Sequence, residues 1–262
     1  MNTMQNQWVL ILGGSSGLGL ATAKKMARHG FHILIIHRDR RSDLEEINRN
    51  FKEITSNGVQ LVSFNINAAN VDKRKETMKE LEAVLTPSGK IKMLVHSIAK
   101  GSLKPMVSEN ETTLNHQDIE ITLNTMSLSI YDWVKAIYEA DLFEADARVV
   151  SFTSEGSSKA WEGYAAVSVA KATLEALTRS MALEYASKGI KANCIQAGIT
   201  ETKSFQMIPN SDVLKKSALE RNPNNRLTTP EDVANAVYLL STDEAKWITG
   251  TVIKVDGGES LR

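Results

Sequence analysis

Short apolar runs alternate with longer helical patterns along the whole chain, at intervals of about 25 to 30 residues. The runs occupy residues 8–12, 31–37, 59–66, 92–98, 147–153, 190–197 and 251–258. Strands separated by helices pair in parallel, because a parallel pair needs a crossover connection. The alternation therefore predicts an α/β fold with a doubly wound parallel sheet of about seven strands. No change in composition divides residues 1–262, so a single domain is expected.

Charge and cysteine content narrow the functional classes. The chain carries 31 Lys and Arg against 31 Asp and Glu, so nothing favours a nucleic-acid or acidic-membrane partner. The single cysteine, Cys194, lies in an apolar run, where a buried structural thiol is expected. The first apolar run is short, ends in glycines and follows no basic segment, so neither a signal peptide nor a membrane span is expected. These features predict a cytoplasmic protein.

A glycine-rich loop joins the first apolar run to the first helical pattern. Glycines let the backbone approach a ligand closely, and the free amides at a helix N-terminus favour an anion. A glycine triplet alone also marks ordinary turns, but a strand before it and a helix after it predict the pyrophosphate loop of a Rossmann fold. The candidate cofactor-binding residues of this loop are Gly13, Ser15, Ser16, Gly17, Leu18 and Gly19.

The segment after the second apolar run indicates which nicotinamide dinucleotide binds. An NAD-selective site usually has an acid here for the ribose hydroxyls, whereas this chain has His37, followed by Arg38 and Arg41. A guanidinium suits a 2′-phosphate because its charge is permanent and its donors are fixed. We therefore expect NADPH rather than NADH, with Arg38 as the first contact and Arg41 as the second. The alternative is that the arginines face solvent and Asp39 binds the ribose.

Tyr164 and Lys171 form a candidate catalytic pair at the start of a long helical pattern. Their spacing is close to two helical turns, so both side chains share one face of the helix. A phenol and an ammonium on one face suit a proton donor and a cation that tunes it. Ser154 follows the fifth apolar run and is placed to direct its hydroxyl toward the same point. The alternatives are a surface tyrosine and lysine on an amphipathic helix, and a turn serine.

Five segments occur together in a recognisable order and spacing. They are GxxxGxG at residues 13–19, Asn124 in ITLNTM, the Ser154, Tyr164 and Lys171 region, AGITET at 197–202 and VDGG at 255–258. In these segments the chain resembles the short-chain dehydrogenase/reductase superfamily over nearly its whole length. Ordinary members have Tyr-x-x-x-Lys, which would put the tyrosine at Val167.

Two departures from the ordinary pattern resemble one branch of this superfamily. The chain has Tyr-x6-Lys, and its fourth apolar run leads into His96-Ser97-Ile98-Ala99; both are similar to the enoyl-acyl-carrier-protein reductases. The compact glycine loop and the serine at position 154 look more like the NADPH-using type of these enzymes. His96 at a strand end is expected to be packed and hydrogen-bonded, and it has no metal-ligand spacing around it.

The resemblance implies roles for further residues. Lys171 would bind the nicotinamide ribose, and Asn124 would hold a backbone kink and a water. The remaining implied cofactor contacts are Asn65 and Ile66 beside the adenine, Ser97, Ile98 and Ala99 on the nicotinamide side, and Ala197, Gly198, Ile199 and Thr202 after the sixth run. Thr202 is expected at the nicotinamide carboxamide, with a helix cap as the alternative.

The resemblance also implies the activity. The expected reaction is hydride transfer to an enoyl thioester, with Tyr164 as the hydrogen-bond donor to the thioester oxygen. The substrate would be carried on acyl carrier protein, and the reaction would belong to fatty acid synthesis. Residues 200–225 would form a substrate loop, in which Phe205, Met207 and Ile208 line an acyl channel. Association into a homodimer or homotetramer through two long helical segments, expected at 118–143 and 165–187, is implied as well. A carbonyl or 3-ketoacyl reductase, and a weakly catalytic dinucleotide-binding protein, remain alternatives.

Overall fold

The structure, a computed structural model, describes residues 6–262 and contains a seven-stranded parallel sheet. The strand order is β3-β2-β1-β4-β5-β6-β7. The strands are β1 (Gln7–Leu12), β2 (His32–His37), β3 (Leu61–Asn65), β4 (Lys90–His96), β5 (Phe143–Thr153), β6 (Ile190–Ala197) and β7 (Val252–Val255). The prediction of a doubly wound, single-domain Rossmann fold is confirmed. The expectation of no signal peptide rests partly on residues 1–5, which lie outside the described residues.

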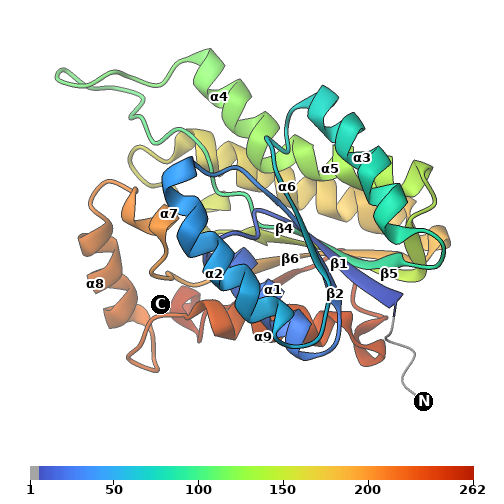
Figure 1. The fold of residues 1–262 in the computed structure, drawn as a ribbon. Helices are drawn as coiled ribbons and strands as arrows, with labels where there is room; N and C mark the ends of the chain where they lie inside the picture. Colours follow the sequence, from blue (N-terminus) through green and yellow to red (C-terminus); the bar gives the residue numbers. More distant parts are fainter. Residues whose placement is uncertain (1–5) are drawn as a thin grey trace.

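Helices cover both faces of the sheet (Figure 1). One face carries α1 (Gly17–Arg28), α2 (Leu44–Thr55) and α9 (Pro230–Ser241), and the other carries α3 (Val71–Leu85), α4 (His116–Leu123), α5 (Ser129–Glu139) and α6 (Ala165–Glu184). Successive residues of β1 point to opposite faces. Leu10 and Leu12 pack in the core beneath α5 and α6, whereas Val9 and Ile11 pack beneath α1 and α9. Burial on both faces explains why the strands are continuous apolar runs.

The long helical segment expected at 118–143 is divided and ends earlier. A π-helical segment, Asn124–Leu128, separates α4 from α5, and α5 ends at Glu139. Asp141 then has a φ of 52°, a left-handed conformation that does not continue a helix. Phe143 begins β5 instead, so the helical expectation was wrong for residues 140–143. The apolar residues Leu142 and Phe143 are buried in the core as part of a strand connection.

The carboxyl ends of all seven strands lie at one edge, because the sheet is parallel. The loop after β6 contains two short helices, α7 (Lys203–Gln206) and α8 (Ser211–Arg221). Both lie within the substrate loop predicted at residues 200–225. In Figure 1 the C-terminus lies beside α8, at this same side of the molecule. Among residues 6–262, no helix is both long enough and apolar enough to cross a membrane.

Candidate active site

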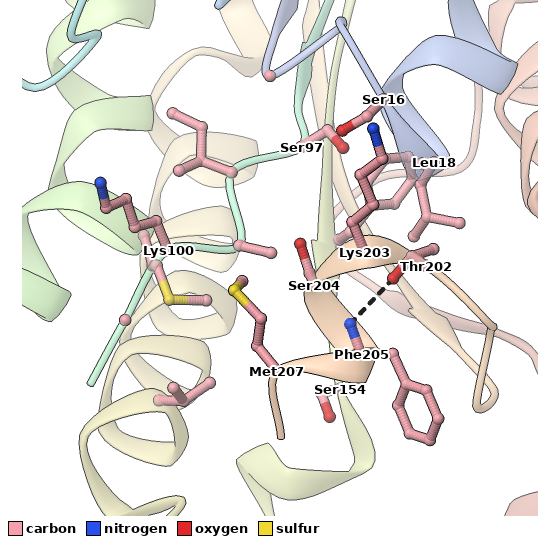
Figure 2. A pocket seen from close by; sticks show the side chains of 18 of the residues that line it. Ser16, Leu18, Ser97, Lys100, Ser154, Thr202, Lys203, Ser204, Phe205 and Met207 are labelled. Carbon is pink, nitrogen blue, oxygen red and sulfur yellow. Dashed lines mark hydrogen bonds between the residues drawn. The ribbon is translucent and has the colours of Figure 1, made fainter. Parts of the chain in front are cut away.

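A cavity of about 660 Å³ opens at the carboxyl edge of the sheet. Its walls come from the loops that follow β1 to β6, from α6 and from α7 (Figure 2). Residues far apart in the sequence, such as Ser16, Ser97, Ser154 and Thr202, therefore meet around one space. A site at this edge, where the strand order reverses between β1 and β4, is the expected ligand site of a doubly wound sheet.

The glycine loop has the shape that a dinucleotide needs. A Cβ on Gly13, whose φ is 89°, would collide with the carbonyl oxygen of Ser97. Gly17 has a φ of 53°, and a Cβ there would lie 3.4 Å from Cγ2 of Thr202. Gly13 therefore leaves room only for backbone, and the positive φ of Gly17 favours glycine, which suits close approach of a pyrophosphate. Gly13, Ser15, Ser16, Gly17 and Leu18 all line the cavity, as predicted.

Gly19 has a different role from its loop neighbours. It does not line the cavity, and a Cβ on it would collide with the carbonyl oxygen of Gly13. The residue is needed so that the first turn of α1 can pack against the loop. Gly19 therefore shapes the candidate cofactor site from behind and does not border the cavity.

The end of β2 brings only part of the predicted basic cluster to the cavity. Arg38 and Asp39 line it, whereas Arg41 is exposed at the start of a short 3₁₀ turn and does not. His37 is buried, and its Nδ1 lies 2.8 Å from Oδ2 of Asp39. Asn65 holds this segment by accepting from the Asp39 N–H at 3.0 Å and donating to its carbonyl at 3.1 Å. Asp39, the alternative ligand of the ribose, is thus already paired with His37.

The ends of β3 and β4 border the cavity with mostly apolar residues. Ser97, Ile98 and Ala99 line it after β4, and Ile66 lines it after β3. Asn65 does not line the cavity; it acts through Asp39. Of the two residues expected beside the adenine, Ile66 therefore borders the cavity and Asn65 does not.

His96 is packed in the interior, as predicted. Its Nε2 lies 2.9 Å from Oγ of Ser129. Burial, and then the positive charge of Lys171, lower the pKa of His96 to about 3. The imidazole is therefore neutral at physiological pH. Among residues 6–262, no group of three or more His, Cys, Asp or Glu side chains could hold a metal ion.

Tyr164 lies at the wall of the cavity, directly before α6 begins. It is only 8% exposed and packs with Met126, Val167 and Ala170 in a small apolar cluster. Burial raises the pKa of the Tyr164 hydroxyl, although a hydrogen bond with Ser154 acts in the opposite direction. The phenol therefore stays protonated at neutral pH, as a hydrogen-bond donor should.

Ser154 and Lys171 complete the catalytic group predicted around Tyr164. Ser154 lines the cavity, and its Oγ also accepts from the Gly156 N–H at 3.2 Å, the contact expected of a turn serine. Lys171 is buried at the cavity wall and donates from Nζ to the carbonyl oxygen of Phe152 at 2.6 Å. Burial lowers the pKa of Lys171 to about 8. The structure thus brings Tyr164, Lys171 and Ser154 together, and the surface-residue alternative is wrong.

Asn124 is not brought to the cavity. The predicted backbone irregularity is present, because the π-helical segment starts at this residue. The side chain, however, is exposed and outside the cavity, while Thr125 and Met126 line it. A π segment holds more residues per turn than an α-helix, so it rotates the following side chains relative to a regular pattern. This rotation could not be read from the sequence.

The segment after β6 closes the opposite side of the cavity. Ala197, Gly198, Ile199 and Thr202 all line it, as expected. Thr202 is also the N-cap of α7, because its Oγ1 accepts from the Phe205 N–H at 3.1 Å (Figure 2). The helix cap is therefore confirmed, and the contact with the nicotinamide carboxamide stays a prediction.

The acyl-channel residues of the substrate loop also reach the cavity. Phe205, Met207 and Ile208 line it, and Met207 extends from the end of α7 into the space (Figure 2). The lining residues that the sequence did not reveal include Lys100, Leu103, Glu155, Trp161, Lys203 and Glu259. None of them belongs to a recognisable motif, so only their positions in the fold reveal them.

Comparison with known proteins agrees with this geometry. The sequence model of the enoyl-(acyl carrier protein) reductase family matches residues 13–260. A 3-oxoacyl-[acyl-carrier-protein] reductase of Staphylococcus epidermidis is 28% identical over 97% of this chain and 98% of its own length. A 7alpha-hydroxysteroid dehydrogenase of Paraclostridium sordellii is also 28% identical, over 100% of this chain and 94% of its own length.

Solved structures support the fold. A short-chain dehydrogenase from Burkholderia cenocepacia in complex with NADP superimposes with a TM-score of 0.83 at 23% identity, covering 99% of this chain and 100% of that one. The NADH-dependent enoyl-[acyl-carrier-protein] reductase of Aquifex aeolicus has a TM-score of 0.81 at 23% identity, covering 100% and 99%. Proteins similar to this chain thus include reductases of both carbon–carbon and carbon–oxygen double bonds.

Proposed function

The chain belongs to the enoyl-(acyl carrier protein) reductase family of the short-chain dehydrogenase/reductase superfamily, and from this we propose that it reduces the 2,3 double bond of an enoyl thioester with NADPH. It is an NAD(P)H-dependent oxidoreductase. The observation that carries the proposal is Tyr164, buried at the cavity wall seven residues before Lys171, with Val167 where an ordinary member has its tyrosine. The proposed substrate is an acyl thioester on acyl carrier protein.

The proposed chemistry needs a donor for the substrate oxygen. When bound, the nicotinamide would supply a hydride to C3 of the enoyl group, and a proton taken up from water at C2 would complete the reduction. The Tyr164 hydroxyl donates a hydrogen bond to the thioester oxygen, where negative charge increases as the reaction proceeds. A raised pKa favours this role, because the proton stays on the phenol in the resting enzyme.

Lys171 and the apolar wall support this donor. The buried Lys171 ammonium is fixed by the carbonyl of Phe152 and adds positive potential at the cavity wall. We assign it to the ribose hydroxyls, as its family counterparts suggest. Leu103, Trp161 and Ile208 pack around the cluster that contains Tyr164, which gives an acyl chain an apolar surface.

An assay with two thioesters tests the proposal. Purified protein with NADPH is expected to oxidise the cofactor when crotonyl thioester is added, but not with acetoacetyl thioester, as followed by absorbance. The reverse result would support the second candidate, a 3-ketoacyl reductase, which the similarity to 3-oxoacyl-[acyl-carrier-protein] reductases favours. Tight NADPH binding with no turnover of either would support a dinucleotide-binding protein, for which Val167 at the usual tyrosine position is the argument.

We propose NADPH as the preferred cofactor because of the two charged residues at the end of β2. Asp39 is paired with His37, whereas Arg38 lines the cavity and, within the described part of the chain, has no acidic partner. Arg38→Ala is expected to raise the Kd for NADPH about 10- to 100-fold, the loss of a charge-assisted contact, and to leave NADH binding unchanged. Fluorescence titration measures both. Arg41→Ala is the matched control and should have little effect; an equal loss in both variants, or in NADH binding, would contradict the assignment.

We also propose association of two or four chains through α4, α5 and α6. Ile121 on α4, Tyr131 on α5 and Val169 on α6 are 57%, 40% and 44% exposed. Apolar side chains exposed on neighbouring helices suit an interface between copies. Light scattering that gives the mass of a single 28.9-kDa chain would contradict this proposal.

A further inference from the structure

Arg221, the last residue of α8, connects the substrate loop to two buried acids at the cavity wall. Its Nη1 donates to Glu155 at 3.2 Å and 3.1 Å, and its Nη2 donates to Oε1 of Glu259 at 3.1 Å. The acid side chains are only 11% and 4% exposed. Lys159 also donates to Glu155, at 2.5 Å. Arg221 and Lys159 together therefore balance two buried carboxylates.

The two acids belong to different walls of the active site. Glu155 directly follows Ser154, on the side that carries Tyr164. Glu259 lies near the C-terminus, and its Oε2 accepts from the backbone N–H of Ile199 at 3.0 Å. Ile199 lines the cavity after β6. One guanidinium therefore joins α8, the Ser154 side and the Ile199 side.

Removal of the Arg221 charge would affect both walls. Burial raises the pKa of Glu259, and the charge of Glu155 raises it further, whereas Arg221 lowers it. Without Arg221, the two carboxylates would repel each other, or Glu259 would take up a proton. Either change alters the carboxylate that holds the Ile199 N–H. A contact on α8 thereby controls a backbone position at the cavity wall.

We propose that Arg221 is a positioning residue that couples the seating of α8 to cofactor binding on the Ile199 side of the cavity. Such a coupling acts in both directions. Cofactor binding should protect the α8 amides from hydrogen exchange, and loss of the α8 contact should weaken cofactor binding. The inference concerns the cofactor alone, so it does not depend on which acceptor the enzyme reduces.

Hydrogen–deuterium exchange and fluorescence titration with NADPH test this coupling. Arg221→Gln is expected to raise the NADPH Kd about tenfold, to speed exchange at residues 197–202, and to abolish NADPH-induced protection of 211–221. The same measurements with NADH keep the test independent of cofactor preference. Arg226→Gln is the matched control, because it removes an exposed arginine ion pair, with Asp232 at 2.6 Å. Its Kd should stay within about twofold of the wild type.

A second substitution keeps the test decisive if the glutamine variant does not fold. Arg221→Lys retains the positive charge but lacks the fixed fork that reaches both acids, so its NADPH Kd should be raised about threefold to fivefold. In either variant, faster exchange confined to 211–221, with an unchanged NADPH Kd and normal exchange at 197–202, would overturn the proposal. Arg221 would then be a local ion pair of α8.

Discussion

Replacing Tyr164 by phenylalanine is expected to lower kcat about 100- to 1000-fold, the effect of removing a donor from a developing oxyanion. The ring itself should remain in place. It packs in an apolar cluster and lies 5.0 Å from the ring of Trp161, contacts that phenylalanine retains. The substitution therefore removes the hydroxyl with little other change, and the Kd for NADPH should change less than about twofold, since the phenol's proposed contact is with the substrate.

Steady-state kinetics with crotonyl thioester measures kcat, and a fluorescence titration measures the Kd for NADPH. Tyr138→Phe is a matched control, because Tyr138 lies on the outer part of α5 with 36% exposure and does not line the cavity. Its kcat should equal that of the wild type. An unchanged kcat in the Tyr164 variant would show that this phenol takes no part in the mechanism. A comparable fall of kcat in both variants would show that the substitutions disturb the fold.

Replacing Lys171 by methionine is expected to lower kcat/KM about 100-fold at pH 7 and to remove one limb of its pH profile. Burial lowers the pKa of Lys171 to about 8, so the ammonium is charged below that pH and neutral above it. If the charged form is the active one, wild-type kcat/KM falls as the pH rises through about 8. The methionine variant, which has no charge to lose there, should be flat over the same range.

The pH profile distinguishes a charge effect from a packing effect. Lys216→Met provides the control, since Lys216 is an exposed lysine of α8 outside the cavity. It should retain both the wild-type rate and the decline above pH 8. A wild-type profile that is level from pH 7 to pH 10, or a decline that persists in the Lys171 variant, would show that the charge of Lys171 does not act in catalysis.

Several site residues could be predicted because their chemistry depends on local sequence. Gly13 and Gly17 lie at the junction of a strand and a helix, and the positive φ of each is a local reason for glycine at these positions. Tyr164 and Lys171 lie on one helix or at its cap, so their separation is set by the helical repeat. The positions of Asn124 and Arg41 outside the cavity could not be predicted in this way. A π segment begins at Asn124, and Arg41 begins a 3₁₀ turn on the surface.

Residues that act only through distant partners could not be predicted. Glu259 and Arg221 are 38 positions apart, and Arg221 and Glu155 are 66 positions apart. No local periodicity connects them, because their contact depends on where α8 and the C-terminus return to the sheet edge. His37 and Asp39 are only two positions apart, yet their pairing could not be predicted either. The backbone of Asp39 is held by Asn65, a residue of β3.

The sequence by itself determined the order of strands and helices, the parallel sheet and the glycine loop, because short-range hydrophobic patterns and backbone freedom control them. It also determined which phenol and which ammonium share a helix face. Only the tertiary structure decided that the phenol is buried, that Asp39 is already paired and that one arginine joins α8 to two walls of the cavity. Desolvation and ion pairing depend on what surrounds a group in space, and that is set by residues far away along the chain.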